Sequence, residues 1–194
     1  MATALELFAR QDYATVTIKD IARGLRVNTA LIYYYFPSKD DLFRATLEYC
    51  IGNALQTFDR LERRHTDPVA MIGAWLSTQA RLAPEIRRLL KIMLDYSTAG
   101  VPSRIADAAI RRFYDAEIKI LSTGVRLGIE QGVFRRVDVK RTAQLASTHL
   151  DGIMARSMIH RQFDVKAAIA DLQRLLWDHL GYHGRRRRKA NGSV

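Results

Sequence analysis

The chain has 194 residues, of which 48% are hydrophobic and 26% charged, and its formal net charge is +11 at pH 7. This length and apolar fraction allow one large domain or two small ones with a sizeable core. No apolar run reaches the roughly eighteen residues of a membrane span. The first residues also lack the basic segment and apolar block of a signal peptide. The single cysteine, Cys50, cannot form an intramolecular disulfide, so we expect a cytoplasmic protein.

The positive charge is unevenly distributed along the chain. Residues 1–64 carry nine basic and eight acidic side chains, and residues 65–184 carry seventeen and twelve. The remaining excess comes from the basic run 185–189, which Gly, Asn and Ser follow. This composition is typical of a disordered tail. The tail either holds DNA nonspecifically through counterion release or only keeps the chain in solution.

Three short helices are predicted at the N-terminus. Residues 2–11 have apolar side chains at helical spacing. A second helix begins after Thr17, which forms a weak capping box with Asp20. A third begins after Asn28, whose side chain can accept an orphan backbone N–H, and it ends before Pro37. The second and third helices, with a turn of about three residues between them, describe a helix-turn-helix, whose second helix enters the major groove of DNA.

The rest of the chain is predicted to be helical, without strand alternation. Ser38 caps a long helix that runs to about residue 64 and has an apolar stripe. Gly132 is the expected stop of a later long helix. The predicted fold is therefore all-α, with about nine helices: a helix-turn-helix domain joined by the long helix to a C-terminal bundle. The predicted body helices cover residues 67–83, 84–97, 103–131, 138–161 and 165–182, and the expected domains are 1–45, 46–183 and a basic tail over 184–194.

Residues 5–48 resemble the N-terminal DNA-binding domain of the TetR family of bacterial transcriptional regulators. Farther along, the stretch 150–153 (Leu-Asp-Gly-Ile) is similar to one common in the penultimate helix of that family. The likeness rests on Leu7-Phe8, Tyr13, the segment 17–22, Val27 and above all the pattern Ile32-Tyr33-x-Tyr35-Phe36-x-Ser38-Lys39-x-x-Leu42.

The resemblance implies a homodimer with a small-molecule pocket in its C-terminal domain and repression of transcription that the ligand relieves. Dimerisation through the last two helices, about 138–161 and 165–182, is implied as well. Family roles in DNA binding transfer to eight positions here. Lys19, Thr29, Ala30 and Tyr33 match base-facing positions, and Thr17, Tyr34, Tyr35 and Lys39 match positions that touch phosphates.

Three departures from the family pattern concern the DNA reader. Arg26 stands where the family prefers glycine, and a positive φ there would cost on the order of 1 kcal/mol or require a remodelled turn. Leu31 stands where a threonine often donates to a phosphate, so we expect that contact to be lost. The first helix starts later than usual, so a phosphate contact from its beginning is expected to be missing, unless translation starts upstream of Met1.

The residue types on the third helix suit DNA. Successive side chains are about 100° apart on a helix, so the hydroxyls of Tyr33, Tyr34 and Tyr35 cannot all be buried. A tyrosine can donate to a phosphate while its ring rests on a sugar or a thymine methyl. We expect Phe36 to be core, whereas Tyr35 is equally compatible with core and phosphate roles. Lys19 can also be an ordinary solvated lysine.

A ligand pocket is expected among apolar and aromatic side chains of the body. Each candidate is also compatible with a plain core role. Few buried charges are obvious in this part of the chain, so we expect a mostly apolar effector. The candidates are Met71, Trp75, Met93, Tyr96, Phe113, Tyr114, Glu117, His149 and Met154.

No cofactor, metal site or enzymatic activity is predicted. Nucleophile-elbow, P-loop and dinucleotide motifs are absent from the sequence. His179 and His183 have the i,i+4 spacing of metal ligands, but no cysteine or carboxylate completes a familiar site. Glycines 124, 128 and 132 favour close packing inside the core. The predicted function is a ligand-responsive repressor that binds a palindromic operator. The alternatives are an enzyme on an α-bundle and a helical interaction module with weak or no sequence-specific DNA binding.

Overall fold

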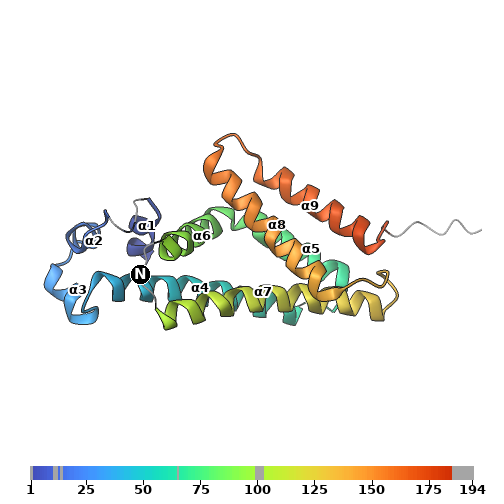
Figure 1. Ribbon diagram of the computed structural model, residues 1–194, viewed down its shortest axis with the longest axis horizontal. Helices are drawn as coiled ribbons and strands as arrows, with labels where there is room; N and C mark the ends of the chain where they lie inside the picture. The colour runs from blue at the N-terminus through green and yellow to red at the C-terminus, as the bar shows by residue number, and fades with distance from the viewer. Residues whose placement is uncertain (1, 11–12, 14, 65, 99–102, 185–194) are drawn as a thin grey trace, which may run out of the picture.

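The computed structural model describes residues 2–10, 13, 15–64, 66–98 and 103–184 (Figure 1). Its described residues form nine α-helices and no strand, which confirms the predicted all-α fold. The basic run predicted to be a disordered tail, 185–189, lies outside the described residues. The helices are α1 (Ala2–Arg10), α2 (Ile18–Leu25), α3 (Thr29–Tyr35), α4 (Lys39–Arg64), α5 (Pro68–Arg81), α6 (Ala83–Thr98), α7 (Arg104–Glu130), α8 (Val139–Ile159) and α9 (Val165–Leu180).

Short polar side chains begin most of the body helices. The N-cap residues of α5, α7 and α8 are Asp67, Ser103 and Asp138, and each accepts a backbone N–H from the first turn of its helix. Such caps satisfy donors that have no partner within the helix. Gly132 has φ +68° just after α7, so the predicted glycine stop of that helix is confirmed.

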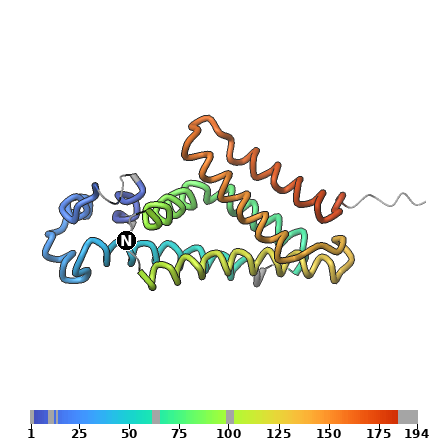
Figure 2. Tube along the Cα trace, viewed as in Figure 1, coloured from blue at the N-terminus to red at the C-terminus, as the bar shows by residue number. Residues whose placement is uncertain are grey.

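The long helix α4 connects the two ends of the molecule. Helices α1, α2 and α3 gather around its beginning, and α7 lies alongside it over much of its length (Figures 1 and 2). Helix α1 packs against both α4 and α6, so the N-terminal helices contact the body through two different helices. Helices α8 and α9 form an antiparallel pair. Helix α8 packs against α6 and α7, and α9 packs against α5.

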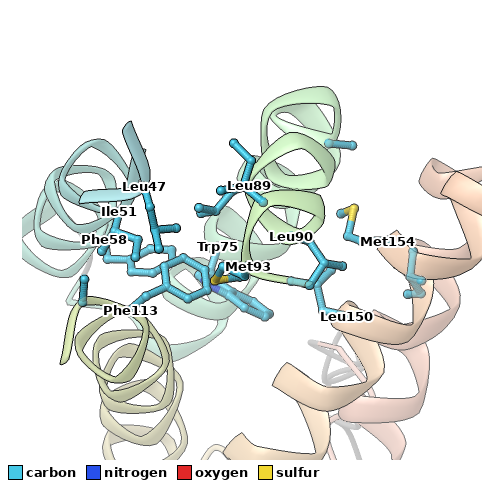
Figure 3. Packing of buried hydrophobic residues seen from close by; sticks show 14 of the residues in the cluster. Leu47, Ile51, Phe58, Trp75, Leu89, Leu90, Met93, Phe113, Leu150 and Met154 are labelled. Carbon is cyan, nitrogen blue, oxygen red and sulfur yellow. The ribbon is translucent and has the colours of Figure 1, made fainter. Parts of the chain in front are cut away.

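One apolar core runs through both parts of the chain. Near the N-terminus, the rings of Phe8 and Phe43 meet edge to face, with their centroids 5.1 Å apart. In the body, Phe58 of α4 and Phe113 of α7 lie 5.8 Å apart, next to the fully buried Trp75 (Figure 3). Because α4 contributes Phe43 and Phe58, a shift of α4 changes the packing at both ends.

Gly128 permits the closest packing on α7. A Cβ atom at this position would lie 1.9 Å from Cδ2 of Phe134, which is only 4% exposed. The ring of Phe134 in turn stacks on Trp177, with centroids 5.9 Å apart, and meets the edge of Tyr182. The glycines of α7 therefore serve core packing, as predicted, and Gly128 anchors the segment after α7 against the end of α9.

A helix that spans a lipid bilayer must be both long and predominantly apolar. None of the described helices is both long enough and apolar enough to span a membrane.

Candidate nucleic-acid interface and effector site

A complete capping box begins α2. The Asp20 backbone N–H donates to Oγ1 of Thr17 over 3.2 Å, and the Thr17 N–H donates to Oδ2 of Asp20 over 3.1 Å. The Thr17 hydroxyl also donates to Oδ2 of Asp20 over 2.5 Å, and this bond, together with the one from the Thr17 N–H, holds the pKa of Asp20 below its usual value. The box that looked weak in the sequence is thus fully formed, and it fixes the direction in which α2 leaves the preceding loop.

The turn between α2 and α3 uses a left-handed residue that is not glycine. Arg26 has φ 56° and ψ 42° and is the one described non-glycine residue with positive φ. The N–H of Val27 closes the turn by donating to the carbonyl of Ala22 over 3.0 Å. The turn therefore keeps the positive φ that glycine would favour, and it is not remodelled around the arginine.

Arg26→Gly is expected to raise the free energy of unfolding by about 1 kcal/mol, because it removes the steric cost of a Cβ in the left-handed region. Urea denaturation measures the change. Arg23→Gly is the matched control, since it removes an arginine from the helical part of α2 and is expected to destabilise by about 1 kcal/mol. Equal destabilisation by both substitutions would contradict the strain at Arg26.

Most of α3 faces solvent. Its N-cap Asn28 accepts the N–H of Ala30 over 2.9 Å, and Ile32 is its one buried residue. Tyr33, Tyr34 and Tyr35 are 53%, 81% and 66% exposed. Tyr35 is thus not a core residue, whereas the neighbouring Phe36 is half-buried against the core. The outer face of α3 therefore offers three exposed phenols.

The remaining candidate DNA contacts surround this face. Thr17, Lys19 and Ala30 are exposed, and Thr29 is half-buried. Lys39 lies at the start of α4, where its Nζ donates to the carbonyl of Tyr13 over 2.9 Å and sits 4.4 Å from the centre of the Tyr13 ring. This ammonium therefore holds the segment before α2 in place, and its contact with phosphate stays a prediction.

Two polar pairs cross the interface between α7 and α8. Ser147 of α8 donates to the buried carboxylate of Glu117, and Tyr114 donates to Oδ2 of Asp151 over 3.0 Å. Burial raises the pKa of Glu117 to about 7, and the negative charge of Asp151 acts in the same direction. Burial also raises the pKa of Asp151, against the opposing effect of the Tyr114 hydrogen bond. Both carboxylates thus resist ionisation in the folded chain.

Several predicted ligand residues lie near this interface. Trp75, Met93 and Phe113 are buried and converge between α4, α6 and α7, with Leu150 of α8 on the opposite side (Figure 3). Met71 is also buried, where α5 passes Gly124 of α7. Among the described residues, the indole nitrogen of Trp75 is the one buried side-chain nitrogen or oxygen without a hydrogen-bond partner.

Three candidates take other positions. Tyr96 links α6 to α7, since its hydroxyl accepts the N–H of Ser103 over 2.8 Å and donates to Oδ1 of Asp107 over 2.8 Å. His149 is exposed and lines a surface groove between α8 and α9. Met154 is fully buried on α8, and Figure 3 places it beyond Leu150 from Trp75. His179, weighed as a metal ligand, instead has Nε2 3.0 Å from Oγ1 of Thr142.

Three residues next to the candidate ligand residues were not predicted from the sequence: Ser147, Asp151 and Phe58. Ser147 and Asp151 stand four residues apart, so they share a face of α8 with the buried Leu150. Polar side chains recurring within an apolar stripe were the available signal. Their pairing with α7, however, depends on the register of two helices, which no local pattern specifies.

Comparisons with known proteins connect this geometry to a family. Residues 1–46 match the family model for bacterial regulatory proteins of the tetR family. The transcriptional regulator HbdR of Aromatoleum sp. is 43% identical over 69 residues, which are 36% of this chain and 30% of HbdR. IcaR of Staphylococcus epidermidis, a negative transcriptional regulator of a biofilm operon, is 25% identical over 96 residues, half of each chain. The chain thus matches less than two thirds of the length of either relative.

A solved structure extends the likeness to the body. A transcriptional regulator from Saccharomonospora viridis, in complex with choline, superposes with a TM-score of 0.76 at 25% sequence identity. The superposition covers 92% of this chain and 93% of the other. The proteins similar to this chain are regulators of transcription, not enzymes.

Proposed function

We propose that this chain, whose residues 1–46 match the family model for bacterial regulatory proteins of the tetR family, is a repressor of transcription that a small molecule releases from DNA. In this proposal it binds a palindromic operator as a homodimer, and it acts in the cytoplasm, where bacterial DNA lies. The two recognition helices would read half-sites one or more turns of DNA apart.

The exposed outer face of α3 is the observation that carries the proposal. Tyr33 and Tyr34 project from a helix that only Ile32 ties to the core. A helix can enter the major groove only with such a free face, and phenols are suited to phosphates, sugars and thymine methyls. Leu31, 47% exposed beside them, adds an apolar group that suits a thymine methyl. Residues 1–64 carry little net charge, so these few side chains would supply most of the specificity.

The exposed side of α8 and α9 supports a homodimer. Leu145 and Leu175 are 59% and 57% exposed, although both are large and apolar. A groove of about 420 Å³ on this side is lined by residues of both helices and of the loop between them, among them Ile153 and Phe163. Apolar patches of this kind mark protein interfaces. A second copy of the chain could cover both leucines by packing its own α8 and α9 against them.

The body supports a response to a small molecule. Apolar and aromatic side chains around Trp75 suit a mostly apolar effector, and the similar regulator from Saccharomonospora viridis was solved with a small ligand, choline. Helix α6, which carries Met93, also packs against α1. A ligand that moves α6 would therefore act on the N-terminal helices, and a coupling of about 1–3 kcal/mol would be enough.

Selection of binding sites from a random pool of DNA duplexes, at a stated salt concentration, tests the proposal. A regulator is expected to enrich a palindrome with two related half-sites. Enrichment of no sequence would overturn the proposal, and it would favour a helical interaction module that has lost specific DNA binding.

Tyr33→Ala is expected to weaken binding to the selected operator by about tenfold, because it removes a side chain worth about 1–3 kcal/mol at a base-facing position. Gel shifts measure the affinity, and sedimentation checks that the dimer is intact. Tyr49→Ala is the matched control, since this exposed tyrosine lies on α4, away from the reading face. Unchanged operator affinity in Tyr33→Ala would count against the role of this face.

A further inference from the structure

The carboxylates of Glu117 and Asp151 lie close together without a basic partner. The chain has 31 lysine and arginine side chains that could balance the negative charge of these carboxylates. In the described part of the chain, none of the ion pairs includes either carboxylate. Their polar contacts are neutral hydroxyls, Ser147 for Glu117 and Tyr114 for Asp151. Burying an unpaired carboxylate is unfavourable, so a compensating positive charge would be strongly favoured here.

The two hydrogen-bonded pairs differ in how deeply they are buried. Glu117 and Ser147 are 2% and 4% exposed, whereas Tyr114 and Asp151 are half-buried. The two hydrogen bonds, Glu117 with Ser147 and Tyr114 with Asp151, lie about one helical turn apart along α7 and α8. The outer pair is thus in partial contact with solvent, and the inner pair lies behind it.

Aromatic rings stand beside the inner carboxylate. Phe113 lies one turn before Glu117 on the buried face of α7, and it contacts Tyr114 edge to face and Phe58 at 5.8 Å. Trp75, which points toward Phe113 in Figure 3, is fully buried and keeps an indole N–H without a partner. Ring faces attract organic cations, and the free indole N–H can donate to a polar substituent on the same molecule.

We infer that Glu117 and Asp151, with Tyr114, Phe113 and Trp75, form the binding site for a small organic cation between α5, α7 and α8. This inference rests on the proposed function, because it assigns a charge to the effector of that regulator. It also narrows the expectation of a mostly apolar effector to an apolar molecule that carries one positive charge. A bare metal ion fits less well, since no described group of three or more histidine, cysteine, aspartate and glutamate side chains could hold one, and calcium or magnesium needs about six oxygen ligands.

Charge balance provides a signature of this site. Because burial and Asp151 raise the pKa of Glu117 to about 7, a part of the Glu117 carboxyl groups is protonated at neutral pH. A bound cation favours the ionised form, so binding must release protons at pH 7 and become tighter as the pH rises. Asp151 is the one charged group that perturbs the pKa of Glu117, and its own raised pKa adds to the effect in the same direction.

Titration calorimetry with matched cationic and neutral probes tests the inference. Benzylammonium, phenethylammonium and benzyltrimethylammonium are compared with benzyl alcohol and 2-phenylethanol, which have similar size and no charge. We expect at least one cation to bind the full-length dimer at least about tenfold more tightly than the alcohols. Repeating the titration at pH 7 in phosphate and in Tris buffer measures proton release, because the two buffers have different heats of ionisation.

Conservative variants locate the binding to these residues. Glu117→Gln and Asp151→Asn keep the shape of the side chain and its hydrogen bond, and each is expected to weaken binding of the cation by at least about tenfold. Glu117→Gln should also abolish most of the proton release. Asp115→Asn is the matched control, because Asp115 is exposed on the same helix, two residues from Glu117. This control is expected to bind the cation like the wild type.

The outcomes separate this inference from the proposed function. If the selected operator is bound but no cation binds, or cations bind equally to wild type and both variants, the cation site is overturned and the regulator stands. If a cation binds through Glu117 and Asp151 but leaves operator affinity unchanged, its role as effector is overturned. The expected result is binding that depends on both carboxylates and weakens the operator complex.

Discussion

Gly128→Ala is expected to lower the free energy of unfolding by about 3 kcal/mol, the upper part of the range for overpacked cores. The new Cβ would lie 1.9 Å from Cδ2 of Phe134 and 2.3 Å from its Cε2, so the ring must move. Phe134 is held by Trp177 and Tyr182, and the backbone of Arg135 donates to the carbonyl of Leu180 over 2.9 Å. A displacement of the ring therefore disturbs the end of α9 as well.

Urea denaturation at constant protein concentration measures this change. Gly52→Ala is the matched control, since Gly52 is also inside a long helix, α4, but a Cβ there meets no atom within 4 Å. The control is expected to stabilise by about 0.5–1 kcal/mol through the higher helix propensity of alanine. If both alanines stabilise the chain, the close approach of Phe134 to Gly128 does not exist in solution.

Glu117→Gln is expected to stabilise the free protein by about 3 kcal/mol at pH 8.5 and by little at pH 4.5. The pKa of Glu117 is raised from 4.5 to about 7 in the folded chain. Below pH 4.5 the carboxyl group is protonated in both states and costs nothing. As the pH rises, the unfolded chain loses this proton first, so stability falls until the folded carboxyl also ionises near pH 7. Glutamine keeps the hydrogen bond from Ser147 without the charge.

The pH dependence of urea denaturation between pH 4.5 and 8.5 checks this expectation. Glu130→Gln provides the control, because this exposed glutamate is at the end of the same helix, and its substitution is expected to change the free energy of unfolding much less than Glu117→Gln at pH 8.5. A constant difference between Glu117→Gln and wild type across this range would show that Glu117 ionises normally. When a cation is bound, Glu117→Gln is instead expected to lower the free energy of unfolding, since the wild-type carboxylate then has a partner.

The helices were predictable because their signals are local. Caps at Thr17 and Asn28 and the stop at Gly132 each depend on a few neighbouring residues, and all three appear where expected. The end of α9 shows the limit. The last helix was predicted to run to residue 182, but the left-handed backbone of Gly181 ends α9 at Leu180.

The site was less predictable because it depends on how helices face one another. Tyr35 was undecided from sequence, since the orientation of α3 is set by the packing of Ile32 on the rest of the domain. His149 was a pocket candidate, yet the face of α8 that packs on α7 leaves it in solvent. The expectation of few buried charges also missed the approach of Asp151 to Glu117, because these residues are 34 positions apart in the chain. Long-range register, not residue type, was the missing information.

The double attachment of α1, to α4 and to α6, has a mechanical consequence. Helices α4 and α6 act as two struts that join the DNA-binding end to the rest of the molecule. When one of these two helices slides along its axis while the other stays fixed, the N-terminal helices attached to both must rotate. A small axial step of α6 would thus become a tilt of α3, and in a dimer the two tilts would change the distance between the recognition helices.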